Sequence, residues 1–123
     1  MTTELNELSK EIHEYAQDKG FWDNPRETGT LLMLIVSELA EALEADRKIK
    51  YALPKEFKKN VDLGGNWHTN FEVYIKDTFE DEIADTFIRL FDLCGAMNID
   101  IEYHINQKLV YNASREYRHG KKY

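Results

Sequence analysis

The feature that most constrains this chain is the spacing of its apolar residues, which recur at intervals of three and four. This spacing places apolar side chains on one face of an α-helix, whereas a half-buried strand alternates every second residue. The pattern predicts four helices, over residues 4–19, 27–48, 72–97 and 101–114, with Asp100 as the N-cap of the last one. Four amphipathic helices with no convincing strand pattern predict an all-α fold, a helical bundle.

Residues 49–70 interrupt the helical pattern. The first half of this stretch is basic and contains Pro54, and Gly64 and Gly65 follow in the second half. Proline and paired glycines are typical of turns and loops. We therefore expect a loop with at most one short helical turn, inserted in a single domain that covers residues 1–123.

The charge of the chain is acidic, with 23 Asp and Glu against 16 Lys and Arg and a formal net charge of -7. An acidic protein is a poor candidate for general binding to nucleic-acid backbones. The segment after residue 107 is basic, with Lys108, Arg115, Arg118, Lys121 and Lys122 against Glu116. This distribution suits a ligand that needs both a metal and cationic side chains, although charge alone favours a solvated basic tail.

Cys94 is the only cysteine, so the chain predicts neither an internal disulfide nor a cysteine-rich zinc site. No run of about 18 apolar residues is present, which predicts no transmembrane helix. The first residues lack the basic and apolar regions of a signal peptide. We therefore expect a cytoplasmic protein.

Two acidic pairs are the candidate site. Glu38 and Glu41 are three residues apart in the second predicted helix, and Glu82 and Asp85 repeat this spacing in the third. Residues three apart share one face of a helix. If the two helices pack antiparallel, the four carboxylates converge, and such a set of hard oxygen ligands suits Mg²⁺ or Mn²⁺.

The acidic pairs have a structural alternative, because such spacings also arise by chance. Glu38 lies within an apolar stripe, where a carboxylate is costly unless a metal or an arginine compensates it. Arg89 follows Asp85 by four residues and is a possible partner. A salt-bridge network is therefore a competing interpretation. We expect Glu80 and Asp81 to point elsewhere on the helix, into solvent.

Several motifs together resemble a known family. Ser37-Glu38-Leu39-Ala40-Glu41 and the later Asp81-Glu82-Ile83-Ala84-Asp85 look like the paired acidic helices of the MazG-like all-α NTP pyrophosphohydrolase superfamily. The segments Lys19–Trp22 and Lys108–Lys121 are also similar to that family. One departure is the gap from Glu41 to Glu82, which is longer than the family usually shows, and its excess falls in residues 49–70.

The resemblance implies Mg²⁺-dependent hydrolysis of a nucleoside triphosphate, an NTP or dNTP, to the monophosphate and pyrophosphate, as in nucleotide-pool house-cleaning. By carry-over the metal ligands are Glu38, Glu41, Glu82 and Asp85, and the catalytic residues are Glu41 and Glu38, with Glu41 favoured as general base. The implied substrate-binding residues are Lys108, Asn112 and Arg115 for phosphate or base, and Trp22 and His13, beside Phe21, for the nucleobase.

Two other classes of protein remain possible. A di-iron or di-manganese bundle needs Glu-x-x-His on two helices, and the chain has this spacing at Glu116–His119. A non-enzymatic helical interaction or oligomerisation module would leave the acids as structural networks. We also expect a homodimer or a dimer of dimers, because Tyr15, Tyr103 and Tyr111 add apolar surface that a small bundle does not readily hide.

Overall fold

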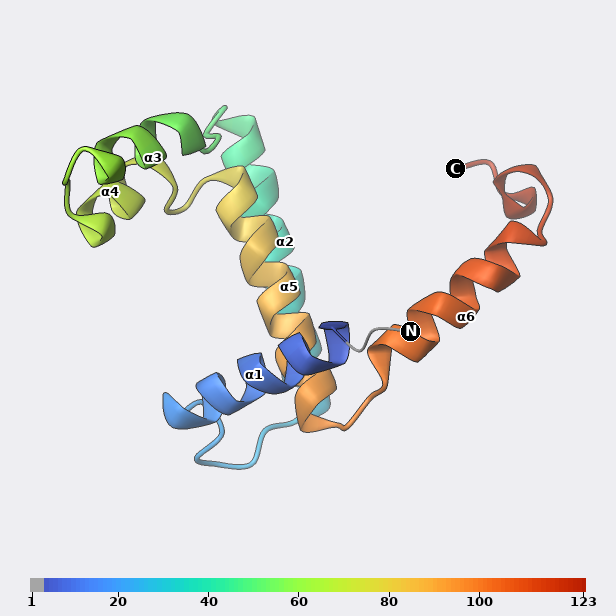
Figure 1. The fold of residues 1–123 in the computed structure, drawn as a ribbon. Coiled ribbons are helices and arrows are strands. Elements are labelled where there is room, and N and C mark those ends of the chain that lie inside the picture. The colour runs from blue at the N-terminus through green and yellow to red at the C-terminus, as the bar shows by residue number, and fades with distance from the viewer. Residues whose placement is uncertain (1–3) are drawn as a thin grey trace. The chain divides into compact units, whose positions relative to one another are not determined.

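The computed structural model describes residues 4–123, and the elements in that range are all helical. Figure 1 shows their order along the chain. The helices are α1 (Glu4–Asp18), α2 (Thr28–Arg47), α3 (Pro54–Asp62), α4 (Trp67–Tyr74), α5 (Phe79–Ala96) and α6 (Ile101–Ala113), followed by the 3₁₀ turn Tyr117–Gly120. The predicted all-α class is confirmed. Within residues 4–123, no helix is both long enough and apolar enough to cross a membrane.

The chain divides into two compact units. One unit is Asn24–Leu90, and the other combines the residues up to Asp23 with Phe91–Tyr123. Helix α5 therefore contributes its first part to one unit and its last turns to the other. The two acidic pairs lie entirely within Asn24–Leu90.

Helix α2 and the first part of α5 run antiparallel and side by side in the unit Asn24–Leu90 (Figure 1). The buried residues of α2 recur at intervals of four and three, as the apolar pattern predicted: Leu31, Ile35, Glu38, Ala42 and Ala45. Glu27 precedes the helix without a capping side-chain hydrogen bond. The position of α2 is therefore determined by the face it buries and not by a capping residue.

Residues 49–70 are not the loop that the sequence predicted, because they contain α3 and the start of α4. Pro54 occupies the first turn of α3, where its missing N–H costs nothing. Gly64, with a φ of 93°, allows the left-handed turn after α3, and the Asn66 side chain accepts from Thr69 N at 2.8 Å to cap α4. Proline and glycine here begin and end short helices instead of excluding them.

The two short helices form a hairpin that is stabilised by aromatic side chains. Helix α3 packs against α4. The Phe57 ring meets the Trp67 and Phe71 rings edge-on, with centroids 5.6 Å and 6.1 Å away, and Trp67 stacks on Phe71 at 5.1 Å. These contacts between two helices give the hairpin its own small apolar cluster.

The predicted helix over residues 72–97 is also corrected, because the chain leaves helical geometry between Tyr74 and Phe79. Asp77 there has a φ of 61°. Leu53 N donates to Tyr74 O at 3.0 Å, and Phe79 N donates to Lys50 O at 2.9 Å. These two bonds close the base of the α3–α4 hairpin, so that α5 begins next to the end of α2.

The second unit is assembled around α1. Ser9 Oγ donates to Phe91 O at 2.5 Å, and α1 contacts α6. A Cβ atom at Gly95 would lie 2.7 Å from His13 Cβ and 2.8 Å from Ser9 O, so only glycine permits this approach. Asp100 accepts from Tyr103 N at 3.0 Å and caps α6, as the sequence predicted.

Candidate metal centre

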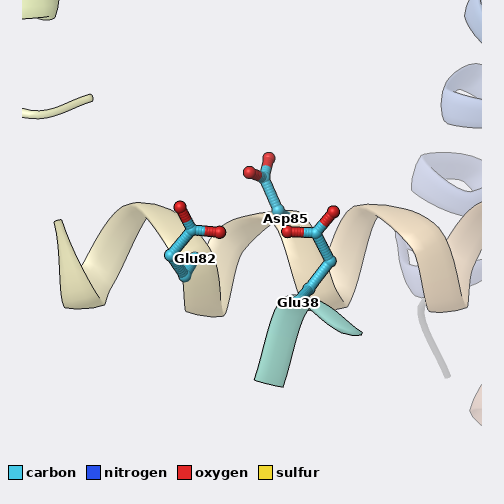
Figure 2. A group of neighbouring side chains, drawn as sticks. All are labelled: Glu38, Glu82 and Asp85. Atoms are coloured by element: carbon cyan, nitrogen blue, oxygen red, sulfur yellow. The ribbon is translucent and has the colours of Figure 1, made fainter. Parts of the chain in front are cut away.

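Three of the four predicted acidic ligands come together in the unit Asn24–Leu90. One oxygen from each of Glu38, Glu82 and Asp85 lies within 4.8 Å of the others. Figure 2 shows Glu38 reaching from α2 toward the two side chains of α5. The three-residue spacing of Glu82 and Asp85 puts both on one face of α5, and the antiparallel packing brings Glu38 opposite them.

The cluster is largely withdrawn from water. Glu38 and Glu82 are buried, with relative exposures of 9% and 4%, and Asp85 is half-buried. The Oε2 atom of Glu82 is buried and has no hydrogen-bond partner. A buried carboxylate oxygen without a donor costs free energy that a bound cation or a proton would offset.

Burial and mutual repulsion change the acidity of the α5 carboxyls. Burial is the main cause that raises the pKa of Glu82 to about 8. The carboxylates of Glu41 and Glu38 add to the rise, because they accept a hydrogen bond only from protonated Glu82 and repel its ionised form. Burial and the charges of Asp81 and Glu38 raise the pKa of Asp85 to about 6, against the opposing effect of Arg89. Without a cation, Glu82 therefore holds a proton at neutral pH.

Arg89 partly neutralises the cluster through an ion pair with Glu38. Its Nε donates to Glu38 Oε1 at 2.9 Å, and the Arg89 side chain is 38% exposed. The four-residue spacing along α5 had pointed to Asp85 as a neighbour of this arginine. The ion pair with Glu38 forms because the antiparallel register sets Glu38 beside the later turns of α5.

Glu41, the fourth predicted ligand, lies outside the group of three converging carboxyls. It is exposed on α2, one turn after Glu38. It remains close enough to Glu82 to contribute to the raised pKa of that carboxyl. Glu41 therefore stands at the solvent side of the cluster.

Asp81 is a residue that the sequence interpretation misplaced. We expected it to face solvent, but it is half-buried, and its carboxyl lies within 4.8 Å of those of Asp77 and Glu82. Asp77 N also donates to Asp81 Oδ2 at 3.0 Å. The sequence did contain a signal for this placement of Asp81. Asp77, Asp81, Asp85 and Arg89 follow one another at intervals of four, and this spacing places residues on one face of a helix.

His13 and Trp22, the predicted nucleobase contacts, lie in the other unit and meet each other through Asp92. His13 Nδ1 is 2.8 Å from Asp92 Oδ1, and Trp22 Nε1 donates to both Asp92 oxygens at 3.0 Å and 3.1 Å. The two rings are edge-to-face with centroids 5.0 Å apart. Asp92 was not singled out from the sequence, because its partners are 70 and 79 residues away.

The predicted phosphate and base contacts lie in the same unit as His13: Lys108, Asn112 and Arg115. Lys108 and Arg115 both approach the ring of Tyr111. Lys108 Nζ lies 4.9 Å from the Tyr111 ring centroid, and the Arg115 guanidinium carbon lies 5.4 Å from it. Arg115 Nη2 also donates to His119 O at 3.2 Å. The Oδ1 atom of Asn112 is buried without a hydrogen-bond partner. Two cationic side chains, Lys108 and Arg115, therefore lie at the Tyr111 ring.

The carboxyl cluster fits a small divalent cation. Its donors are all carboxylate oxygens, which Mg²⁺ and Mn²⁺ prefer over nitrogen and sulfur ligands. A cation would pair the buried Glu82 Oε2 and displace the proton that Glu82 otherwise retains.

No protein-family model, no curated protein and no solved structure matches this chain. Any function assigned to it therefore has to follow from its own residues.

Proposed function

We propose that the chain hydrolyses a nucleoside triphosphate, an NTP or dNTP, to the monophosphate and pyrophosphate with bound Mg²⁺ or Mn²⁺. The observation that supports a cation is the buried group of Glu38, Glu82 and Asp85, in which Glu82 Oε2 has no donor. The nucleoside triphosphate substrate is proposed from the resemblance of the two acidic helices to the MazG-like superfamily. Natural proteins rarely bury several carboxyls together without a compensating ligand.

Glu38, Glu82 and Asp85 would hold the cation. A bound divalent cation would neutralise triphosphate oxygens and help to orient a water for in-line attack. Because Mg²⁺ keeps several coordination positions for water and phosphate, three carboxyls from two helices suffice for such a site. The helical positions of these residues hold the ligands rigidly, which catalysis requires.

Glu41 is the residue best placed to accept a proton from the attacking water. It is exposed at the edge of the cluster and interacts with Glu82, so it borders both solvent and the proposed cation. Glu38 is the other candidate for the general base, but its Oε1 already accepts a hydrogen bond from Arg89 Nε. Glu41 thus serves as general base and Glu38 as metal ligand.

The remaining predicted residues all belong to the other unit, and their role in nucleotide binding is proposed from their own chemistry. Lys108 and Arg115 supply positive charge for phosphate oxygens, with Arg115 able to form bidentate contacts. The unsatisfied Asn112 Oδ1 accepts a hydrogen bond from a ligand donor such as a base amino group. His13 Nδ1 and Trp22 Nε1 are already hydrogen-bonded to Asp92. These two residues would therefore contact a nucleobase by stacking of their aromatic rings.

A second candidate function is a non-enzymatic helical interaction module. It is favoured by the ion pair of Arg89 with Glu38, which neutralises part of the cluster without a metal. This alternative predicts that Mg²⁺ does not stabilise the protein and that no nucleotide is turned over. The enzyme proposal predicts stabilisation by Mg²⁺ and turnover of a nucleotide.

The test is a turnover assay with each common NTP and dNTP, in which monophosphate and pyrophosphate are separated by ion exchange. We expect Mg²⁺-dependent release of both products, lowered at least about 100-fold in Glu82→Gln. Glu56→Gln, on the exposed face of α3, is the matched control and retains activity. Absence of turnover together with absence of Mg²⁺-dependent thermal stabilisation would reject the enzyme in favour of the interaction module.

A further inference from the structure

The densest run of positive charge in this acidic chain lies where α2 ends and α3 begins. Residues 47–59 contain six cations against the single acid Glu56, a formal charge of +5 in a chain of net charge -7: Arg47, Lys48, Lys50, Lys55, Lys58 and Lys59. In the described part of the chain, Lys48 is the one among these cations that forms an ion pair, with Glu44. Figure 1 shows α3 beside the end of α2, so the cations share one region of the unit Asn24–Leu90.

The lysines of α3 are turned away from α4. Phe57 packs on the aromatic rings of α4, and Val61, one turn later, is half-buried. Two residues along an α-helix rotate a side chain by about 200°, so Lys55 and Lys59 lie opposite Phe57. Both are exposed, as is Lys58. The outer side of α3 is therefore a basic surface open to an anionic partner.

Exposed apolar side chains stand at both ends of this basic surface. Ile49 is 79% exposed between the exposed Lys48 and Lys50, and Leu63 is 76% exposed in the turn after α3. Leu63 follows Lys59 by four residues, so it continues the lysine side of the helix. Apolar side chains among lysines are typical of surfaces that rest on a bilayer, where the lysines stay at the headgroups and the apolar groups enter below them.

Ile49 also adopts a backbone conformation that glycine adopts more easily. Its φ is 55°. Lys50 N donates to Ala45 O at 2.8 Å and Ile49 N donates to Asp46 O at 3.0 Å, a pair of bonds that usually closes a helix at glycine. A β-branched residue is strained in this region. Because the side chain is exposed, packing within the unit does not offset the strain, and this indicates a contact outside the chain.

We propose that residues 47–63 form a peripheral binding surface for an anionic lipid bilayer. The lysines and Arg47 bind the headgroups, and Ile49 and Leu63 enter the boundary between headgroups and acyl chains. A nucleic-acid backbone would also attract the lysines, but it would leave both apolar side chains in water, so a lipid surface accounts for more of the exposed residues. The inference goes beyond nucleotide hydrolysis and does not depend on it, because no carboxyl of the metal centre takes part.

The test is co-sedimentation of the full chain with vesicles of phosphatidylcholine and phosphatidylserine, beside vesicles of phosphatidylcholine alone. We expect the wild type to bind the anionic vesicles, more weakly as salt is raised, and to leave the neutral vesicles almost unbound. Lys55→Gln combined with Lys58→Gln and Lys59→Gln is expected to lower the partition constant at least about 10-fold.

The matched control removes the same charge from exposed positions of the other unit, by combining Lys10→Gln, Lys121→Gln and Lys122→Gln. We expect this control to bind the anionic vesicles as the wild type does. A loss of binding in the control equal to that in the α3 variant would show that net charge alone is responsible, and it would overturn the proposed surface.

Ile49→Gly separates binding from folding, because glycine relieves the left-handed backbone at this position. We expect an unchanged or higher melting temperature together with a partition constant at least about 5-fold lower. Failure of the wild type to bind anionic vesicles, or unchanged binding in Ile49→Gly or in the α3 lysine variant, would overturn the proposal. Binding to a single-stranded oligonucleotide but not to anionic vesicles would also overturn it and identify a nucleic acid as the partner.

Discussion

Glu82 carries the strongest electrostatic perturbation among the residues of the cluster, and its raised pKa makes stability depend on pH. Its pKa rises from about 4.3 in an unfolded chain to about 8 in the fold. The folded protein therefore binds an additional proton between these values, so the stabilisation is complete below about pH 4 and is lost as the pH rises through 8. Asp85, with a pKa raised to about 6, acts in the same direction.

We expect the metal-free protein to lose stability from pH 5 to pH 8, by an amount on the order of a few kcal/mol. The measurement is urea denaturation in the presence of a chelator at several pH values. Glu82→Gln, which is neutral throughout, is expected to flatten this dependence. An equally steep dependence in the variant would show that other groups cause it.

Arg89 distinguishes a metal centre from a structural ion-pair network. Arg89→Met leaves Glu38 buried without its cation, and we expect this to destabilise the metal-free protein by about 1–2 kcal/mol, given the partial exposure of the arginine. Saturating Mg²⁺ is expected to recover most of that loss, because the cation compensates the same carboxyl. Thermal unfolding with and without Mg²⁺ measures both effects.

The control for this experiment is Arg47→Met, which removes an exposed arginine from the last turn of α2. We expect it to change the melting temperature little in either condition. If Mg²⁺ stabilises Arg89→Met no more than Arg47→Met, the acidic cluster is a salt-bridge network and not a metal site.

At the scale of elements, the α3–α4 hairpin shows where helical periodicity is a weak guide. The helices contain nine and eight residues, which is too few for a recurring apolar face to stand out. Their stability comes from the contacts of Phe57 with Trp67 and Phe71, which join two helices. The same limitation explains the helix predicted over residues 72–97, whose first residues belong to α4.

We expect Trp67→Ala to loosen this hairpin without unfolding α2, because the aromatic cluster lies within α3 and α4. Loss of the stacked and edge-on contacts costs about 1–2 kcal/mol. Hydrogen exchange followed by mass spectrometry is expected to show faster exchange in residues 54–74 and unchanged exchange in α2. Val73→Ala, an exposed position on α4, is the control, and equal acceleration in both variants would contradict a role for the cluster.

At the scale of the whole molecule, a second apolar stripe on α2 is the surface at which the expected self-association can be tested. Leu32, Val36, Leu39 and Leu43 recur at intervals of four, three and four, and each is about half exposed, at 47–50%. This spacing is typical of helices that pack against another helix. Tyr15, Tyr103 and Tyr111 are exposed too, as the sequence suggested. The oligomeric state itself stays a prediction.

We expect the wild-type protein to form a homodimer or a dimer of dimers and Leu39→Lys to shift it toward the monomer. A charge in an apolar helix–helix interface is costly to bury, which is the reason for this direction. Light scattering coupled to size-exclusion chromatography at micromolar concentration measures the mass. Leu63→Lys, in the exposed turn after α3, is the control and is expected to leave the mass unchanged. A monomeric wild type would reject this interface.

The sequence by itself determined the all-α class, the buried stripe of α2, the Asp100 cap and the presence of two acidic pairs, because these depend on local spacing. Only the tertiary structure decided which carboxyls meet. The antiparallel register of α2 and α5 set Arg89 on Glu38 and left Glu41 at the edge. Such pairings join residues up to 51 positions apart, and no local pattern specifies which turn of one helix faces which turn of another.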